Sequence, residues 1–79
     1  MPKFRKKTLI DAVRWTGDLH ALSQFAGKAV TVNEDLTVTV ATMEGAMTGQ
    51  HGDWIAKGAH GEFYPIAAAV FADTYEPVE

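Results

Sequence analysis

The chain has 79 residues, a hydrophobic fraction of 47%, no cysteine and a formal net charge of -3. A chain of this length is expected to fold as a single domain, residues 1–79, around a small core. The lack of cysteine excludes disulfides, thiolate nucleophiles and zinc ribbons, and it agrees with a reducing cytosol. Since nothing in the sequence approaches a membrane span, we expect a cytosolic protein that does not enter a membrane.

Basic residues are concentrated near the start of the chain. A basic arm on an otherwise acidic body would bind phosphates weakly and with steep salt dependence, so nucleic acid is not the expected partner. The preferred interpretation is a basic edge strand that lies beside the acidic C-terminal run, residues 75–79. Five of the seven basic residues belong to this region: Lys3, Arg5, Lys6, Lys7 and Arg14.

The first predicted elements are a strand and a helix. Residues 8–15 are rich in β-branched and aromatic side chains and end before a Thr-Gly turn, which is typical of a strand. The main helix is predicted over about residues 18–26, since Asp18 is a favourable N-cap and Gly27 a favourable stop. So short a helix is unstable alone, and its apolar stripe is expected to pack on the sheet. That stripe consists of Leu19, Leu22 and Phe25.

A series of hairpins is predicted in the middle of the chain. A brief strand over residues 30–32 leads through a turn at 33–35 into the clearest strand pattern, residues 36–41. Residues 46–50 can pair back after a turn, and residues 51–53 reverse the chain a third time. One face of the clearest strand is threonine-rich, and the other carries the apolar residues Leu36, Val38 and Val40.

The C-terminal region is predicted to contain a short helix and an edge strand. The helix covers about residues 67–72, with Val70 and Phe71 packing inward. Residues 74–76 follow as an edge strand, where the proline at position 77 is tolerated. The predicted fold class is therefore α+β: a small antiparallel sheet of hairpins, able to roll toward a barrel, with one main helix packed on it.

The stretch HGDWIAKGAHGEFY, residues 51–64, contains two similar motifs, His-Gly-Asp-Trp and His-Gly-Glu-Phe. If the hairpin turns in two residues, 58 and 59, then Trp54 faces Phe63 and this aromatic pair lies on the core face. The opposite face is expected to carry the other side chains of the hairpin: Asp53, Ile55, Lys57, His60, Glu62 and Tyr64.

The two histidines of this stretch do not predict a metal site. A strand rises about 3.3 Å per residue, so His51 lies roughly 20 Å of chain from the turn that holds His60. In the same register Lys57 faces His60, and a cation held by His60 and Glu62 would lie beside the Lys57 ammonium. We therefore expect no metal and no cofactor. The repeat is interpreted as structural: glycines turn the chain, acids stay at the surface and aromatics enter the core.

The sequence also shows no catalytic constellation. Ser23 is the only serine, and it lies on the predicted helix with no histidine at an obvious supporting position. His20 lies in the first turn of that helix and is expected to face solvent. The acidic pair at residues 34 and 35 falls in a turn, and the glycines form no phosphate-binding pattern. We expect a protein that is not an enzyme.

Three segments carry a resemblance to a known family. They are residues 1–17, with Phe-Arg-Lys-Lys leading to Ala-Val-Arg-Trp-Thr-Gly; residues 52–65, with Gly-Asp-Trp-Ile-Ala-Lys-Gly and Gly-Glu-Phe-Tyr-Pro; and residues 71–78, Phe-Ala-Asp-Thr-Tyr-Glu-Pro-Val. In these segments the chain resembles a family of small bacteriophage-encoded proteins. Such proteins often have proline in place of His51, and a cysteine and a proline in place of residues 66–69. The differences favour a helical segment and remove any thiol-based role.

The resemblance implies a phage gene product that acts in the cytoplasm of an infected bacterium, and it brings no catalytic residues with it. The leading hypothesis is a non-enzymatic accessory protein that self-associates and binds a bacterial host or defence protein. Its contact surface would be the hairpin, with Lys57, His60, Glu62 and the exposed aromatic Tyr64. The alternative is a small-molecule or nucleotide-binding sequestering protein with a basic site at a subunit interface. That basic site would consist of Arg5, Lys6, Lys7 and Arg14.

Overall fold

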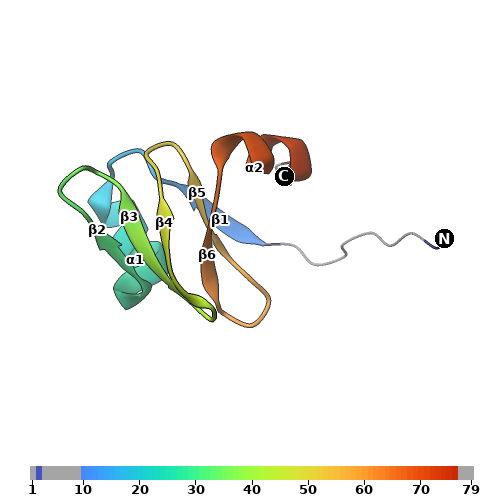
Figure 1. Ribbon diagram of the computed structural model, residues 1–79, viewed down its shortest axis with the longest axis horizontal. Coiled ribbons are helices and arrows are strands. Elements are labelled where there is room, and N and C mark those ends of the chain that lie inside the picture. Colours follow the sequence, from blue (N-terminus) through green and yellow to red (C-terminus); the bar gives the residue numbers. More distant parts are fainter. Residues whose placement is uncertain (1, 3–9, 77–79) are drawn as a thin grey trace.

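The computed structural model describes residue 2 and residues 10–76. Within them the predicted α+β class is confirmed: there are two antiparallel three-stranded sheets, ordered β1-β5-β6 and β2-β3-β4, and neither closes into a barrel (Figure 1). The elements in chain order are β1 (Asp11–Arg14), α1 (Leu19–Ala26), the 3-10 turn η1 (Gly27–Ala29), β2 (Val30–Val32), β3 (Val38–Thr42), β4 (Gly45–Gly49), β5 (Trp54–Lys57), β6 (Phe63–Ile66) and α2 (Ala68–Thr74).

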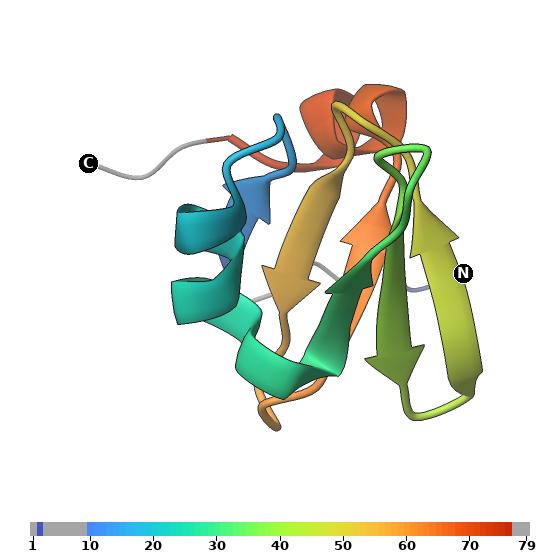
Figure 2. The ribbon, with the colours of Figure 1, turned by 90° about the vertical axis from the view of Figure 1, so that its left-hand side faces the viewer.

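The two sheets share one hydrophobic core, and α1 closes its open side. Figure 2 shows α1 beside β1 and leading through η1 into β2, so that the helix connects the two sheets. The core contains residues from the helix and from both sheets, and Phe25 of α1 contacts Phe63 of β6 edge to face with ring centroids 5.6 Å apart. The largest fully buried side chains among the described residues are Trp15, Leu22, Val38, Val40 and Ile55.

Trp15 connects the turn before β3, in one sheet, to the turn before β5, in the other. Its side chain is buried, and its indole Nε1–H donates to the carbonyl oxygen of Leu36 at 2.6 Å. The backbone of Trp15 also exchanges hydrogen bonds with the turn before β5: Trp15 N–H donates to Asp53 O at 2.8 Å, and Gly52 N–H donates to Trp15 O at 2.7 Å. A buried indole N–H needs an acceptor. Through its side chain and its backbone, Trp15 therefore connects two turns to the core.

The two sheets approach each other closely at Gly49. A Cβ added to Gly49 would lie 3.1 Å from Val38 Cγ2, 3.4 Å from Pro65 Cβ and 3.5 Å from Ile55 Cδ1. A side chain at position 49 would press on Val38, so glycine allows the end of β4 to lie this near to β5 and β6.

The prediction of the main helix is confirmed, including both ends. The Asp18 side chain accepts a hydrogen bond from Ala21 N–H at 3.1 Å, and Gly27 ends the helix with its N–H donating to Ser23 O. Leu22 is buried as expected, and His20 is exposed as expected. The prediction that Leu19 packs on the sheet is wrong. Leu19 begins the helix in a stretch, residues 16–20, that is exposed throughout, beyond the area that the sheet covers.

The predicted register of the β5–β6 hairpin is wrong. The loop contains five residues, 58–62, in place of two, and the strands pair with Lys57 opposite Phe63 and Trp54 opposite Ile66. Gly58 N–H donates to Glu62 O at 2.8 Å and Gly61 N–H donates to Gly58 O at 3.1 Å. Gly61 has φ +80°, which a side chain rarely adopts, and this residue allows the wider loop.

The shift in register places Trp54 and Phe63 on opposite faces of the sheet. Ile55 is buried in the core, whereas its neighbour Trp54 points away from the core and is half-buried. There Phe71 of α2 stacks on it, with ring centroids 4.1 Å apart and planes 7° apart. The expectation that Trp54 and Phe63 form a core pair is therefore wrong; Phe63 packs on Phe25 and Trp54 packs on α2.

Two further expectations for apolar residues are wrong. Leu36 does not begin a strand: it lies in the turn before β3 with φ 67° and is exposed, because its N–H donates to Asn33 O and closes the turn. Val70 does not pack inward, since the face of α2 that contacts the sheet is the one with Phe71. The helix itself is confirmed and extends two residues further than expected, to Thr74.

Residues 74–76 do not form the predicted edge strand. Thr74 is the last residue of α2, and Tyr75 N–H donates to Phe71 O to end the helix. The Tyr75 ring lies 5.1 Å from the Phe71 ring, so the segment is held by aromatic packing and not by strand pairing. The proposed pairing of the basic residues with the end of the chain lies outside the described residues, as does the first part of the predicted strand over 8–15. No helix among the described residues is long and apolar enough to span a membrane.

Candidate functional site

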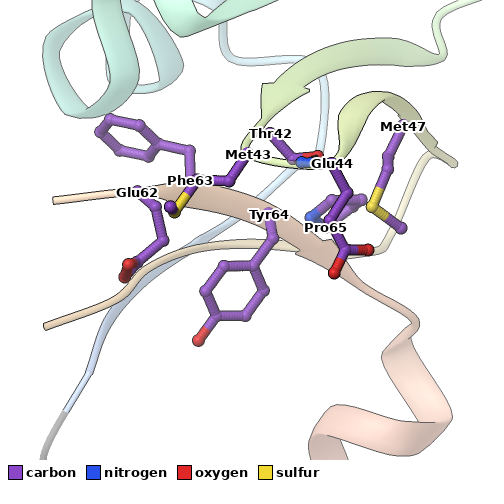
Figure 3. A pocket seen from close by; sticks show the side chains of 8 residues that line it. All are labelled: Thr42, Met43, Glu44, Met47, Glu62, Phe63, Tyr64 and Pro65. Atoms are coloured by element: carbon purple, nitrogen blue, oxygen red, sulfur yellow. Dashed lines mark hydrogen bonds between the residues drawn. The ribbon is translucent and has the colours of Figure 1, made fainter. Parts of the chain in front are cut away.

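An open apolar groove lies between the β3–β4 hairpin and β6. Its volume is about 350 Å³, and apolar atoms form most of its surface. We call it the methionine groove; Figure 3 shows its lining residues: Thr42, Met43, Glu44, Met47, Glu62, Phe63, Tyr64 and Pro65.

One wall of the groove is the tight turn between β3 and β4. Thr42 pairs with Gly45, the Thr42 hydroxyl donates to Gly45 O at 2.5 Å, and Glu44 N–H donates back to Thr42 Oγ1 at 3.2 Å. These bonds fix the turn and leave Met43 at its tip, where the residue is 84% exposed. Met47 lies further along β4 and is 45% exposed. This hairpin therefore carries two exposed methionines.

The other wall is β6 and the end of the loop before it. Phe63 is held from two sides, by the Phe25 ring and by Lys57, whose Nζ lies 5.9 Å from the Phe63 ring centroid. Pro65 is opposite Ile55 in the sheet and adjoins the close sheet contact at Gly49. This wall is rigid because its residues pack on the core, so the adaptable side of the groove is the methionine side.

Two carboxylates lie at the ends of the groove. In Figure 3 Glu62 lies at one end of the drawn side chains and Glu44 at the other. The Glu62 carboxylate folds back over its own loop, where Oε1 accepts a hydrogen bond from His60 N–H at 3.3 Å. No basic residue lines the groove. Its rim therefore favours a cationic group, while its floor favours an apolar one.

The structure separates the side chains that were predicted to form one hairpin surface. Glu62 and Tyr64 line the groove. Lys57 is opposite Phe63 while Tyr64 is opposite Ala56, so Lys57 and Tyr64 point to opposite faces of the sheet. The prediction that they share one face is wrong, because the loop is three residues wider than expected.

The remaining predicted site residues lie elsewhere. His60 is exposed on the loop between β5 and β6. Arg14 ends β1, and its Nε donates to Gly52 O at 2.9 Å, so it supports the turn before β5. Arg5, Lys6 and Lys7 lie outside the described residues. Among the described residues no group of three or more histidines, aspartates or glutamates is placed to hold a metal ion.

Sequence reasoning missed the residues that make the groove apolar. Met43 lies in the β3–β4 turn and Met47 lies four positions later on β4, and two methionines on a predicted hairpin were the available signal. Pro65 gave no such signal, since its place in the groove depends on how the two sheets pack. The groove offers shape, polarizable sulfur and a carboxylate rim, which suit binding of another molecule.

Comparison with known proteins finds no match: no protein-family model fits the chain, and no curated protein or solved structure is significantly similar to it.

Proposed function

We propose that this protein is a non-enzymatic, phage-encoded accessory protein that binds a bacterial host or defence protein through the methionine groove, in the cytoplasm of the infected cell. The observation that carries the proposal is the exposure of Met43 and Met47, 84% and 45%, above a groove of about 350 Å³. Exposed methionines place apolar surface in water, which is unfavourable, and they do not contribute to the core. Adaptable methionine surfaces are typical of sites that bind a partner segment.

The groove defines the chemistry of the partner segment. An apolar side chain would fill the floor between Met43, Phe63 and Pro65. A lysine or arginine beside that side chain would lie near Glu44 or Glu62. The expected partner therefore presents an apolar anchor next to basic residues, and the acidic rim steers its approach.

The same acidic rim does not favour the alternative function, binding of a nucleotide or another anionic small molecule. Anions are bound by arginine, lysine or backbone N–H groups, whereas the groove presents carboxylates. Arg14 already donates to Gly52 O. A basic site at a subunit interface remains a prediction from the sequence alone.

Affinity capture tests the proposal. The tagged protein is incubated with bacterial lysate beside a groove variant, Met43→Ser with Glu44→Lys, and retained proteins are quantified by mass spectrometry. The matched control is Leu19→Ser with Val70→Ser, which removes two apolar side chains of 56% and 55% exposure that lie outside the groove.

A host protein retained by the wild type and the control, and lost from the groove variant, would support binding through the groove. Equal retention by all three proteins would show that another surface binds. No specific protein retained by the wild type would contradict the proposed function. Thermal unfolding of each variant, recorded in parallel, separates lost binding from lost folding.

A further inference from the structure

The edges of the two sheets differ in their protection against pairing with another chain. β6 carries Pro65, which has no N–H to donate, and β1 begins with Asp11 and ends with Arg14. β2 has only three residues and lies beside α1. Among the described residues β4 is the edge strand with neither a charge, a proline nor a covering helix.

The composition of β4 makes its backbone accessible. Its sequence is Gly-Ala-Met-Thr-Gly, and Gly45 to Thr48 are exposed. Its hydrogen-bonded neighbour among the described strands is β3, so alternate residues of β4 direct N–H and C=O groups away from the sheet. Edge strands of this kind usually carry lysine, proline or a bulge, and β4 has no such feature to prevent pairing.

We propose that β4 pairs with β4 of a second copy of this chain, antiparallel and centred on Met47, so that two three-stranded sheets join as one sheet of six strands. The two Met47 residues then face each other, and Ala46 faces Thr48 of the second copy. The strand suits its own copy because it has glycine at both ends and small residues on both sides of the centre. This inference goes beyond the proposed function and does not depend on it.

Charges next to the strand agree with this register. Pairing centred on Met47 places Glu44 opposite Gln50 of the second copy, so the two Glu44 carboxylates are kept apart. Pairing centred nearer the turn would bring the two carboxylates together. Among antiparallel registers of this strand, the one centred on Met47 gives the longest overlap while it keeps the two Glu44 carboxylates apart.

The side chains of β4 also fit the arrangement. Met47 lies opposite Val40 and shares its face, yet it is 45% exposed whereas Val40 is fully buried. The residues two positions before and after Met47 are Gly45 and Gly49, so β4 itself carries no other side chain on that face beside Met47. Pairing would cover the exposed part of Met47 and leave Met43, at the tip of the turn, available to another partner.

Charge substitutions on the outer face of β4 test the pairing and its register. Ala46→Lys with Thr48→Lys places two like-charged pairs across the two-fold axis and is expected to weaken the dimer about tenfold or more. Ala46→Lys with Thr48→Glu places opposite charges at the same positions and is expected to restore it. Sedimentation velocity over a range of concentrations measures both variants and the wild type.

Disulfide trapping gives a second, independent readout, since the natural chain has no cysteine. Met47→Cys places two thiols opposite each other, at a Cα separation of about 4.5 to 5.5 Å, within the range that a disulfide spans. Thr48→Cys is the matched control, because in this register its two copies are about 7 Å or more apart. Mild oxidation should link the first variant and leave the second unlinked.

The predicted results are a wild-type dimer, a dimer weakened by the two lysines and restored by the lysine–glutamate pair, and selective linking through position 47. A wild type that stays monomeric at the highest concentrations would overturn the proposal. A dimer unaffected by both charge variants would also overturn it, as would equal linking by the two cysteine variants. A Met43→Ser control separates this outcome from groove binding, since it should leave the dimer unchanged.

Discussion

Trp54 and Phe71 stack face to face, with ring centroids 4.1 Å apart, and so join β5 to the C-terminal helix on the side of the sheet opposite the core. Phe71 in turn contacts Tyr75, whose ring is 5.1 Å away. Trp15, in contrast, packs inside the core, where it is 1% exposed. The two tryptophans therefore stabilise different parts of the molecule, and their substitutions should have different effects.

Trp15→Ala is predicted to destabilise the protein by about 3–5 kcal/mol, because it leaves a large cavity and removes the donor to Leu36 O. Trp54→Ala is predicted to cost less, about 1–2 kcal/mol, since Trp54 is half-buried and its main loss is one aromatic stack. Urea unfolding of both variants measures the difference. A greater loss for Trp54→Ala would show that the core lies on the other face of the sheet. If Trp15→Ala does not fold, Trp15→Phe provides the comparison.

Asp53 is predicted to hold the start of α2. Its Oδ2 accepts from Gln50 N–H at 2.8 Å, and its Oδ1 accepts from Ala68 N–H, the first residue of the helix, at 3.2 Å. Asp53→Ala removes both acceptors, so we expect a loss of about 1–2 kcal/mol and faster hydrogen exchange at the Ala68 amide. The exposed Asp73 is the control: Asp73→Ala should change neither quantity. Unaltered exchange at Ala68 in the Asp53 variant would contradict the assignment.

Gly61 is predicted to determine the width of the β5–β6 loop. Nothing lies within 4 Å of a Cβ added there, so the cost of Gly61→Ala comes from φ +80° alone and should be about 1 kcal/mol. Gly61→Asn should cost less, because asparagine tolerates this conformation. Chemical denaturation of the two variants measures the order. Equal costs for alanine and asparagine would mean that the loop does not need a left-handed residue at this position.

Asp35 is predicted to contribute to stability at neutral pH and to lose this contribution in acid. The Thr37 hydroxyl donates to Asp35 Oδ1 at 2.6 Å and Thr37 N–H donates at 3.1 Å, and these bonds lower the pKa of Asp35 below its ordinary value of 3.8. Since the folded-state pKa is the lower one, the contribution is complete above the unfolded-state pKa and is lost as the pH falls through the folded-state pKa.

Thr37→Val removes the hydroxyl, which is the larger cause of the lowered pKa. The pKa of Asp35 should therefore rise toward 3.8, as measured by NMR titration of its carboxyl carbon. A titration curve that is unchanged by the substitution would exclude the hydroxyl as the cause.

Local signals predicted much of the fold. The cap at Asp18, the stop at Gly27 and the alternation of Val38 and Val40 depend on residues close in sequence, and the structure confirms each of them. The prediction of the hairpin register was wrong because the register depends on the left-handed conformation of Gly61. The composition of the loop does not distinguish a five-residue loop with this conformation from a two-residue turn.

The candidate site was predicted only in part, for the same physical reason. Glu62 and Tyr64 were expected at a functional surface and line the groove. The groove as a whole requires the β3–β4 hairpin to meet β6, and the close approach at Gly49 is part of that contact. The alternation of residues along a strand does not predict how two sheets pack on each other. The sequence therefore could not predict that Met43 and Pro65 line the same groove.

Site-specific photo-crosslinking at position 43 tests the central claim, binding of a bacterial protein through the methionine groove, most directly. A photoreactive amino acid replaces Met43 in one protein and Val70, an exposed residue outside the groove, in the control. Both are expressed in bacteria, irradiated and analysed by mass spectrometry. We predict one bacterial protein linked at position 43 and absent at position 70. No adduct at position 43, or the same adducts at both positions, would contradict the claim.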